Sequence, residues 1–368
     1  MKSRELKNVE WGIIVVAIIL SIIGIVALFS ATKSTNHQEF TKQIGFLVVS
    51  LIAMVITMLI DYNSFVKISS IGYGAVIVLL IGVLFTTPVN GATSWFDLGF
   101  FSFQPSEFAK LVIILFITYI INRIQKRGFS NINKVKNLAL IFVCMIVPIL
   151  LIINQPDYGT AMAIIFGVGF MLIAARLDKK YIIYAIVLII IGVPLLYMYI
   201  LPEHATKRID VFLNPESDPR GDGYNIIQSK IAIGSGRITG MGYLQGNQTQ
   251  LGYLHPKTTD FIFAVISEEL GFIVAAPMII MYVYLITKAI YIAKTAKDLT
   301  GTLIASGITG IFIFHTVENI GMVMGLLPIT GVPLLFVSYG GSSLLISYIS
   351  LGLLLNISSK RQKTIFVK

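Results

Sequence analysis

Residues 11–30 read WGIIVVAIILSIIGIVALFS, and this stretch decides the fold class of the chain. It contains no charged side chain and has the length, roughly 20 residues, that an α-helix needs to cross the hydrocarbon core of a bilayer. The run is too long for the apolar core of a signal peptide and is followed by no convincing cleavage site. It therefore predicts a first transmembrane helix.

The rest of the chain continues this pattern. Its 368 residues are 56% hydrophobic and 12% charged, whereas a soluble domain carries about 25% charged residues. We therefore expect an all-α polytopic membrane protein with about ten transmembrane helices in one domain over residues 1–368. The eighth run is too long for one perpendicular helix, and we expect it to begin as a shallow or partly re-entrant segment. The apolar runs fall near 11–30, 43–60, 67–86, 106–122, 137–154, 159–176, 181–201, 261–293, 301–326 and 342–358.

The distribution of Lys and Arg predicts the orientation in the membrane. With an even number of helices both termini lie on one side, and that side collects clusters such as 123–127 and 176–180. The short loops on the opposite side hold only Lys33 and Lys42. Cytoplasmic loops of membrane proteins carry the excess of Lys and Arg, so we expect both termini to be cytoplasmic. This pattern also explains the net charge of +10 without a nucleic-acid partner.

One long connection breaks the charge pattern. Residues 202–260 lie between the seventh and eighth apolar runs, on the outer side, and combine cations with many glycines. Connections this long are uncommon in compact proteins and are usually functional or disordered. Because the connection also contains the apolar stretches 224–227 and 231–233, we expect part of it to lie at the membrane surface.

Ionisable residues at membrane depth are costly, and by default they mark functional sites. Glu107 and Lys110 are three residues apart on one face of the fourth helix, so they can pair or share a partner, with a purely structural ion pair as the alternative. Ser106 is expected to cap the start of that helix. Asp157, in the turn before the sixth helix, is expected to cap it.

Asp260 ends the basic connection and is followed at once by Phe261-Ile262-Phe263. A carboxylate at the outer rim, between cations and apolar surroundings, is well placed to accept a proton from a substrate hydroxyl. The alternative is that Asp260 only caps the eighth helix.

Two further pairs of ionisable residues lie in apolar surroundings. Glu268 and Glu269 are adjacent, so they should not both ionise without a nearby cation; a transporter would use them for protons or ions, and a fixed scaffold would pair them with Lys or Arg. His315 and Glu318 are three residues apart on the ninth helix and resemble half of a metal site. Without a second such motif the sequence favours other roles for them.

The segment 325–343 contains Gly325, Pro328, Gly331, Pro333, Gly340 and Gly341, which together stop any regular helix. It leads into Ser342 and Ser343. Non-helical backbone at membrane depth occurs only where protein or a water-filled cavity covers it. We therefore expect this segment to line a cavity.

These motifs, in this order, resemble the SEDS family, the membrane proteins RodA, FtsW and SpoVE of bacterial cell-wall synthesis. The short termini and Trp95-Phe96-Asp97-Leu98-Gly99 favour the elongation member RodA, with the division and sporulation members FtsW and SpoVE as alternatives. One departure lies beside the expected catalytic residue: relatives often read Pro-Glu-x-His-Thr-Asp where this chain has His255-Pro256-Lys257-Thr258-Thr259-Asp260. The matching stretches are 95–110, 155–161, 208–214, 223–224, 228–229, 232–236, 259–264, 268–271 and 319–343.

The resemblance implies a glycosyltransferase in the bacterial plasma membrane that polymerises lipid II at the outer face, beside a class B penicillin-binding protein. It implies inversion at the anomeric carbon, an undecaprenyl diphosphate leaving group and Asp260 as the catalytic aspartate. It also suggests a divalent cation, Mg²⁺ or Mn²⁺, and no organic cofactor; the residues that would hold a metal are unknown. The candidate substrate-binding residues are Trp95, Glu107, Lys110, Arg208, Arg220, Lys230, Arg237, Lys257, Ser342 and Ser343.

Two other functions fit the residues alone. Buried ionisable groups and broken helices are typical of transporters, so a flippase for the lipid-linked precursor is an alternative, although the sequence shows no inverted repeat. A membrane scaffold without substrate turnover is another.

Overall fold

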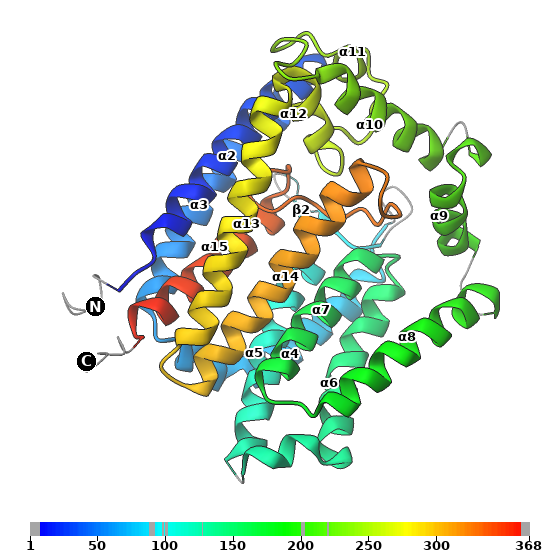
Figure 1. The fold of residues 1–368 in the computed structure, drawn as a ribbon. Helices are drawn as coiled ribbons and strands as arrows, with labels where there is room; N and C mark the ends of the chain where they lie inside the picture. Colours follow the sequence, from blue (N-terminus) through cyan, green and yellow to red (C-terminus); the bar gives the residue numbers. More distant parts are fainter. Residues whose placement is uncertain are drawn as a thin grey trace, which may run out of the picture.

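The computed structural model describes residues 8–87, 93–97, 99, 102–126, 128–199, 203–218 and 221–361. Within these ranges the chain is almost entirely helical (Figure 1). The long helices are α2 (Trp11–Ala31), α3 (Gln38–Leu59), α4 (Tyr62–Val83), α5 (Pro105–Gln125), α6 (Val135–Ile153), α7 (Tyr158–Ala174), α8 (Lys179–Tyr199), α13 (Phe272–Thr295), α14 (Leu299–Val323) and α15 (Gly341–Ser359).

These ten helices in the described ranges match the ten predicted apolar runs one for one. Eight of them are long and apolar enough to cross a membrane. The other two are α5, which carries Glu107, Lys110 and Arg123 on an otherwise apolar helix, and α7, which is apolar but 17 residues long. The predicted class of all-α polytopic membrane protein is confirmed.

The eighth apolar run, which we expected to begin irregularly, is broken at Gly271. The run divides into the short helix α12 (Ile262–Leu270) and the long helix α13. Gly271 has a φ of +71°, and a Cβ built on it would lie 2.2 Å from the backbone nitrogen of Gly240. Only glycine fits here, because it tolerates positive φ and leaves room for the neighbouring chain.

The two chain ends meet at one end of the bundle, which we call the terminal end (Figure 1). Glu10, just before α2, accepts hydrogen bonds from Arg361 (2.5 Å), after α15, and from Lys288 (3.1 Å) in α13. Asp61 and Lys360 form a second ion pair there (2.5 Å). Burial raises the pKa of Glu10, but the hydrogen bonds from Arg361 and Lys288 outweigh it and hold the pKa below its ordinary value.

Helices α14 and α15 form the centre of the bundle, and most of their residues are buried. Small residues let α14 approach its neighbours closely, as is common for helices in membranes. A Cβ on Gly310 would lie 2.8 Å from the Phe166 carbonyl oxygen of α7.

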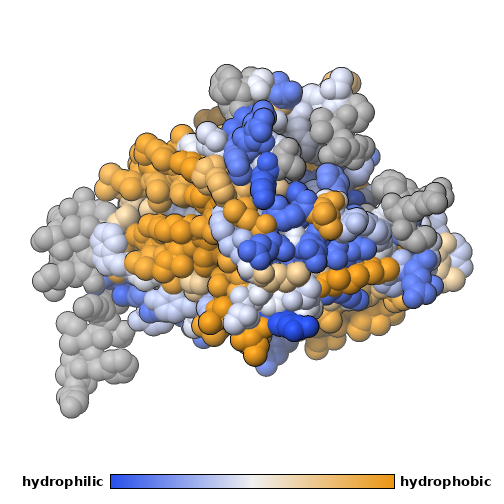
Figure 2. Space-filling view, turned by 90° about the horizontal axis from the view of Figure 1, so that it is seen from above, coloured by the Kyte–Doolittle hydropathy of each residue, from blue (hydrophilic) through white to orange (hydrophobic). Residues whose placement is uncertain are grey.

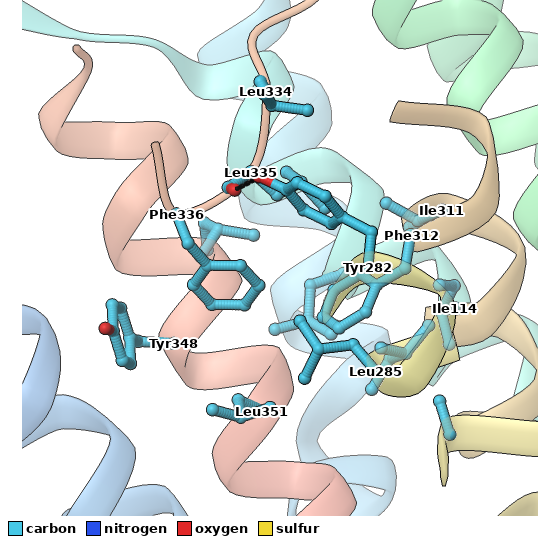
Figure 3. Packing of buried hydrophobic residues seen from close by; sticks show 14 of the residues in the cluster. Ile114, Tyr282, Leu285, Ile311, Phe312, Leu334, Leu335, Phe336, Tyr348 and Leu351 are labelled. Carbon is cyan, nitrogen blue, oxygen red and sulfur yellow. Dashed lines mark hydrogen bonds between the residues drawn. The ribbon is translucent and has the colours of Figure 1, made fainter. Parts of the chain in front are cut away.

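The non-helical segment after α14 is packed into this core. Tyr282 of α13 donates a hydrogen bond to the Leu335 carbonyl (2.6 Å), and Phe336 packs edge-on against Phe312 and Tyr348 (Figure 3). The prediction that residues 325–340 form no regular helix is confirmed. Protein covers the side chains from Leu334 to Val337, so this part of the segment does not line an open cavity.

The opposite end of the bundle, which we call the loop end, carries the long connection. The described parts of this connection, 203–218 and 221–260, are more regular than the sequence indicated, because 224–227 and 231–233 both lie in α10 (Asp222–Gly236), which packs on α12. Figure 2 views this end from above: hydrophilic residues gather over its centre, with apolar side chains at the flanks. The remaining elements are α9 (Glu203–Leu213), α10 (Asp222–Gly236), α11 (Asn247–Gln250), η1 (Lys33–Thr35), η2 (Phe129–Asn133), η3 (Pro215–Ser217) and the antiparallel strands β1 (Phe96–Asp97) and β2 (Ser102–Phe103).

Candidate functional site

Asp260 lies at the loop end, directly before α12, and is partly exposed. Phe261 occupies the N-cap position of α12, so the alternative that Asp260 serves only as the helix cap is wrong. Its carboxylate lies beside Gly331, since a Cβ built on Gly331 would be 3.5 Å from Asp260 Oδ2. The carboxylate is thus next to the non-helical segment that follows α14.

The backbone around Asp260 is held by three hydrogen bonds from distant parts of the chain. The side-chain amide of Asn319 in α14 donates to the Asp260 carbonyl (2.9 Å) and also to the Val332 carbonyl (2.8 Å). Ser338 Oγ donates to the Thr259 carbonyl (2.6 Å). The Tyr339 N–H donates to the Thr258 carbonyl (2.9 Å). These bonds fix the position from which Asp260 projects.

The predicted cations lie at different distances from Asp260 along the loop end. Arg208 donates to the Ile329 carbonyl (3.2 Å), two residues from Gly331, so it borders the same segment as Asp260. Lys257 is three residues before Asp260 and donates to the Thr249 carbonyl (2.9 Å). Burial lowers the pKa of Lys257, although the charges of Glu269 and Glu39 oppose this.

Two other predicted cations are exposed. The side chain of Lys230 lies against Gly325, at the start of the non-helical segment. Arg237 ends α10, and its carbonyl accepts a hydrogen bond from the N–H of Phe272, at the far end of α12 from Asp260. Arg220 lies outside the described residues.

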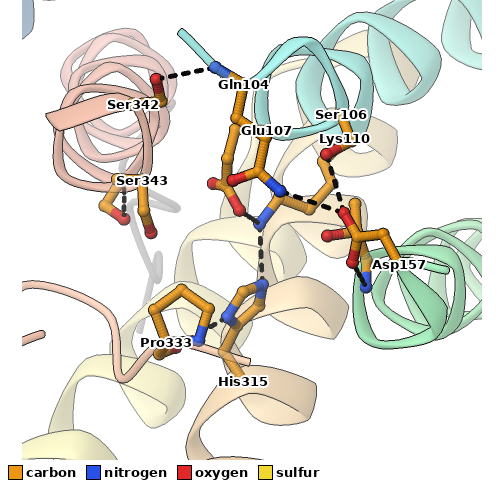
Figure 4. Close-up of polar contacts among 11 residues, drawn as sticks. Gln104, Ser106, Glu107, Lys110, Asp157, His315, Pro333, Ser342 and Ser343 are labelled. Atoms are coloured by element: carbon orange, nitrogen blue, oxygen red, sulfur yellow. Dashed lines mark hydrogen bonds and ion pairs between the residues drawn. The ribbon is translucent and has the colours of Figure 1, made fainter. Parts of the chain in front are cut away.

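Glu107 and Lys110 form a buried ion pair (Figure 4). Lys110 Nζ lies 2.9 Å from Glu107 Oε1 and 2.8 Å from His315 Nε2, and His315 Nδ1 lies 3.0 Å from the Pro333 carbonyl oxygen. A lysine ammonium only donates, so Nε2 accepts and Nδ1 carries the proton that binds Pro333. Glu107, Lys110 and His315 are 2%, 1% and 0% exposed. Glu107 and Lys110 therefore form the structural ion pair that the sequence offered as one alternative.

A second polar group joins α5, α7 and α15 at the loop end (Figure 4). Asp157 accepts from the Thr160 N–H (3.1 Å), which confirms its predicted role as the cap of the sixth helix. Its other oxygen accepts from Ser106 Oγ (2.8 Å) and Gln104 Nε2 (3.1 Å). The prediction that Ser106 caps α5 is wrong, because α5 begins at Pro105 and the hydroxyl of Ser106 turns to Asp157.

Three further predicted site residues lie near this group. Ser342 is buried at the start of α15, and its Oγ accepts from the Gln104 N–H (3.2 Å). Ser343 is partly exposed, and its carbonyl accepts from Ser347 Oγ (2.7 Å). Trp95 is partly exposed in the coil directly before β1.

Glu268 and Glu269 are 0% and 2% exposed, and hydrogen-bond donors surround both carboxylates. Glu268 accepts from the Gln248 and Thr249 N–H groups (2.7 and 3.0 Å) and from Thr249 Oγ1 (2.6 Å). Glu269 accepts from Ser30 Oγ (2.7 Å), among other donors. Among the described residues neither carboxylate forms an ion pair with Lys or Arg. Backbone N–H groups and side-chain donors satisfy the carboxylate oxygens instead, and the pair fastens the loop after α10 to α12 and α2.

His315 and Glu318 do not converge on a common point. Both nitrogens of His315 are engaged as described, and Glu318 accepts from Thr330 Oγ1 (2.8 Å). Sequence analysis assigned no role to Asn319 or Ser338, although both lie in stretches that carry the resemblance. The sequence did offer one signal for Asn319, because it places a polar amide beside Glu318 in an otherwise apolar helix.

Comparison with known proteins agrees with this arrangement. Residues 10–363 match the FtsW, RodA and SpoVE family of cell cycle proteins. The chain belongs to that family. It is similar to the peptidoglycan glycosyltransferase MrdB of Escherichia coli (38% identity, covering 87% of this chain and 86% of that protein) and RodA of Treponema pallidum (33%, 98% and 100%).

The fold of the family is also seen in a solved structure. A chain from a peptidoglycan synthase complex, in which polymerization and crosslinking are coordinated, superposes with a TM-score of 0.80 at 26% identity. The match covers 95% of this chain and 97% of that chain. Membership of the FtsW, RodA and SpoVE family therefore rests on both sequence and fold.

Proposed function

We propose that this chain is a peptidoglycan glycosyltransferase that polymerises lipid II for cell elongation and shape. The observation that carries the proposal is Asp260, a partly exposed carboxylate on rigidly held backbone at the loop end of a chain from this family. The names of the relatives support the reaction class. The similarity of this chain to MrdB and RodA supports a role in elongation over one in division or sporulation.

In the proposed reaction the 4-hydroxyl of the acceptor GlcNAc loses its proton to Asp260. The hydroxyl oxygen then attacks the anomeric carbon of the donor MurNAc, the bond to undecaprenyl diphosphate breaks, and configuration inverts. One carboxylate base is sufficient, because a diphosphate departs without the protonation that an ordinary glycosidic oxygen requires. The hydrogen bonds that hold residues 258–260 support catalysis by position, since misplacement of a reacting group by 1 Å can cost about a hundredfold in rate.

The leaving diphosphate needs positive charge. The candidates are Arg208, which borders the segment beside Asp260, Lys257, three residues before Asp260, and Lys230 at the start of that segment. The described residues contain no group of three or more His, Cys, Asp or Glu side chains that could cage a metal ion. If Mg²⁺ or Mn²⁺ takes part, Asp260 and the diphosphate of the substrate would hold it, since Mg²⁺ is often bound by one or two carboxylates and substrate phosphates. Such an ion would neutralise charge on the leaving group.

We place the loop end outside the cell and the terminal end, with both termini, in the cytoplasm. The surplus of Lys and Arg on the terminal side supports this orientation. We further propose a class B penicillin-binding protein as the partner, because a similar chain is part of a complex that coordinates polymerization and crosslinking.

The contacts of Glu268 and Glu269 weigh against the alternative of a precursor flippase. Both carboxylates accept hydrogen bonds from fixed donors within the fold, as expected for a structural role rather than for a transport site.

A polymerisation assay tests the proposal. Purified protein and lipid II, with and without a partner and Mg²⁺, should give glycan polymer. Asp260→Asn should reduce the rate by about 10²–10⁴-fold, the usual contribution of a general base. Glu216→Gln, an exposed carboxylate on the same connection, is the matched control and should keep the full rate. Full activity of Asp260→Asn would refute the site, and transport of lipid II by wild-type protein without polymer would favour the flippase.

A further inference from the structure

A cavity of about 630 Å³ opens at the terminal end, far from Asp260. It lies between α4, α5, η2 and the first residues of α14. Pockets for small molecules are usually about 300–1,000 Å³ in volume. The cavity is therefore large enough for a lipid headgroup or a small metabolite.

Three cations from two helices line this cavity. They are Lys67 of α4, Arg123 in the last turn of α5 and Lys126, the C-cap residue of α5. All three are exposed, and none takes part in an ion pair within the described part of the chain. Arg176 adds a fourth cation nearby, 5.6 Å above the ring of Phe129, which also lines the cavity.

The carboxylate in the lining is that of Asp298, and it is already engaged. It caps α14 by accepting from the Gly301 N–H (2.8 Å), and it accepts from the Tyr62 hydroxyl (2.9 Å). The cavity therefore keeps an excess of positive charge. Asn63 and Thr300 add polar groups to the same wall.

The apolar surface beside the cavity indicates which kind of anion would bind there. Ile68 and Ile71 on α4, next to Lys67, are 60% and 76% exposed, as expected for side chains that face lipid tails. A ligand with a phosphate in the cavity could lay its hydrocarbon chains along this face. Basic pockets between transmembrane helices on the cytoplasmic side are typical sites for anionic headgroups.

We propose that this cavity binds the phosphodiester headgroup of an anionic phospholipid. Lys67, Arg123 and Lys126 contact the phosphate, and the acyl chains lie against α4. The site is separate from the proposed polymerisation site and does not depend on it.

Native mass spectrometry of the full chain in detergent, titrated with phosphatidylglycerol, tests the proposal. Wild-type protein should retain phosphatidylglycerol but not phosphatidylcholine. The variant with Lys67→Gln, Arg123→Gln and Lys126→Gln should bind phosphatidylglycerol about a hundredfold more weakly, from the usual contribution of three basic residues near a membrane surface. The single variant Arg123→Gln should be weaker by about fivefold.

The control variant carries Lys134→Gln, Lys136→Gln and Lys294→Gln, which remove three exposed lysines outside the cavity lining. It should bind phosphatidylglycerol as wild type does. Equal loss in both triple variants would overturn the proposal, because it would indicate only general charge attraction. Binding of soluble glycerol phosphate as tightly as phosphatidylglycerol would also overturn it, in favour of a soluble phosphate. If the cavity triple variant does not fold, Arg123→Gln decides: unchanged binding refutes the site.

Discussion

The buried ion pair of Glu107 and Lys110 gives a quantitative prediction about stability. Lys110→Met would remove the ammonium and leave Glu107 Oε1 and His315 Nε2 without their partner. Glu107 Oε2 is already buried without a hydrogen-bond partner in the described part of the chain, so the carboxylate would lose the hydrogen bond that Lys110 donates to its other oxygen. Removing one member of a buried pair costs about 3–5 kcal/mol, which raises the unfolding equilibrium constant roughly a hundredfold to several thousandfold.

The double variant separates this explanation from a general loss of packing. In Glu107→Gln with Lys110→Met no unpaired charge remains, and the main loss is the contact to His315, about 1–3 kcal/mol. The double variant should therefore be more stable than Lys110→Met alone. Lys136→Met, at an exposed site, should change stability by no more than about 0.5 kcal/mol.

The free energy of unfolding in detergent can be followed by the fluorescence of the two tryptophans, Trp11 and Trp95. The reasoning fails if Lys110→Met costs less than about 1 kcal/mol. It also fails if the double variant loses the sum of the two single losses.

Three further predictions follow from other contacts. Asn319→Leu removes the amide that holds the Asp260 carbonyl, and the polymerisation rate should fall about tenfold to a hundredfold; an unchanged rate would exclude a positioning role. Gly271→Ala should destabilise the chain by at least about 1 kcal/mol because of its positive φ, whereas Gly45→Ala, in open space on α3, should be neutral or stabilising; equal effects in thermal unfolding would contradict this. Since the pKa of Glu10 lies below its ordinary 4.5, the stability lost in Glu10→Gln should be full above that ordinary value and should vanish as the pH falls through the lowered pKa; a loss independent of pH would be inconsistent with the ion pairs.

The sequence predicted the number and order of the long helices because hydrophobic length is a local property of the chain. The excessive length of the eighth run likewise predicted an irregular start, but the break at Gly271 itself came only from the structure. The structure of the long connection was harder to predict, since α10 has one buried and one exposed side and contains glycines, which are typical of loops. Ile226 and Ala232 are buried there against neighbours that are distant in the sequence.

The candidate site also depends on contacts between residues that are distant in the sequence, which local patterns do not predict. Asp260 could be chosen from its local position between cations and an apolar run. Its supports, Asn319 and Ser338, are 59 and 79 residues away from the carbonyls that they bind, and no periodicity links them. Two of the hydrogen bonds that Glu268 accepts come from backbone amides, which side-chain patterns do not reveal.

The ion pair of Glu10 with Arg361 has a practical consequence. Because it brings the beginning of α2 and the end of α15 together, the two halves of a split fluorescent reporter, one fused to each terminus, should reassemble on a single molecule. The fluorescence of that reporter in living bacteria, measured with quenchers that do and do not enter the cell, would show on which side of the membrane the two termini lie.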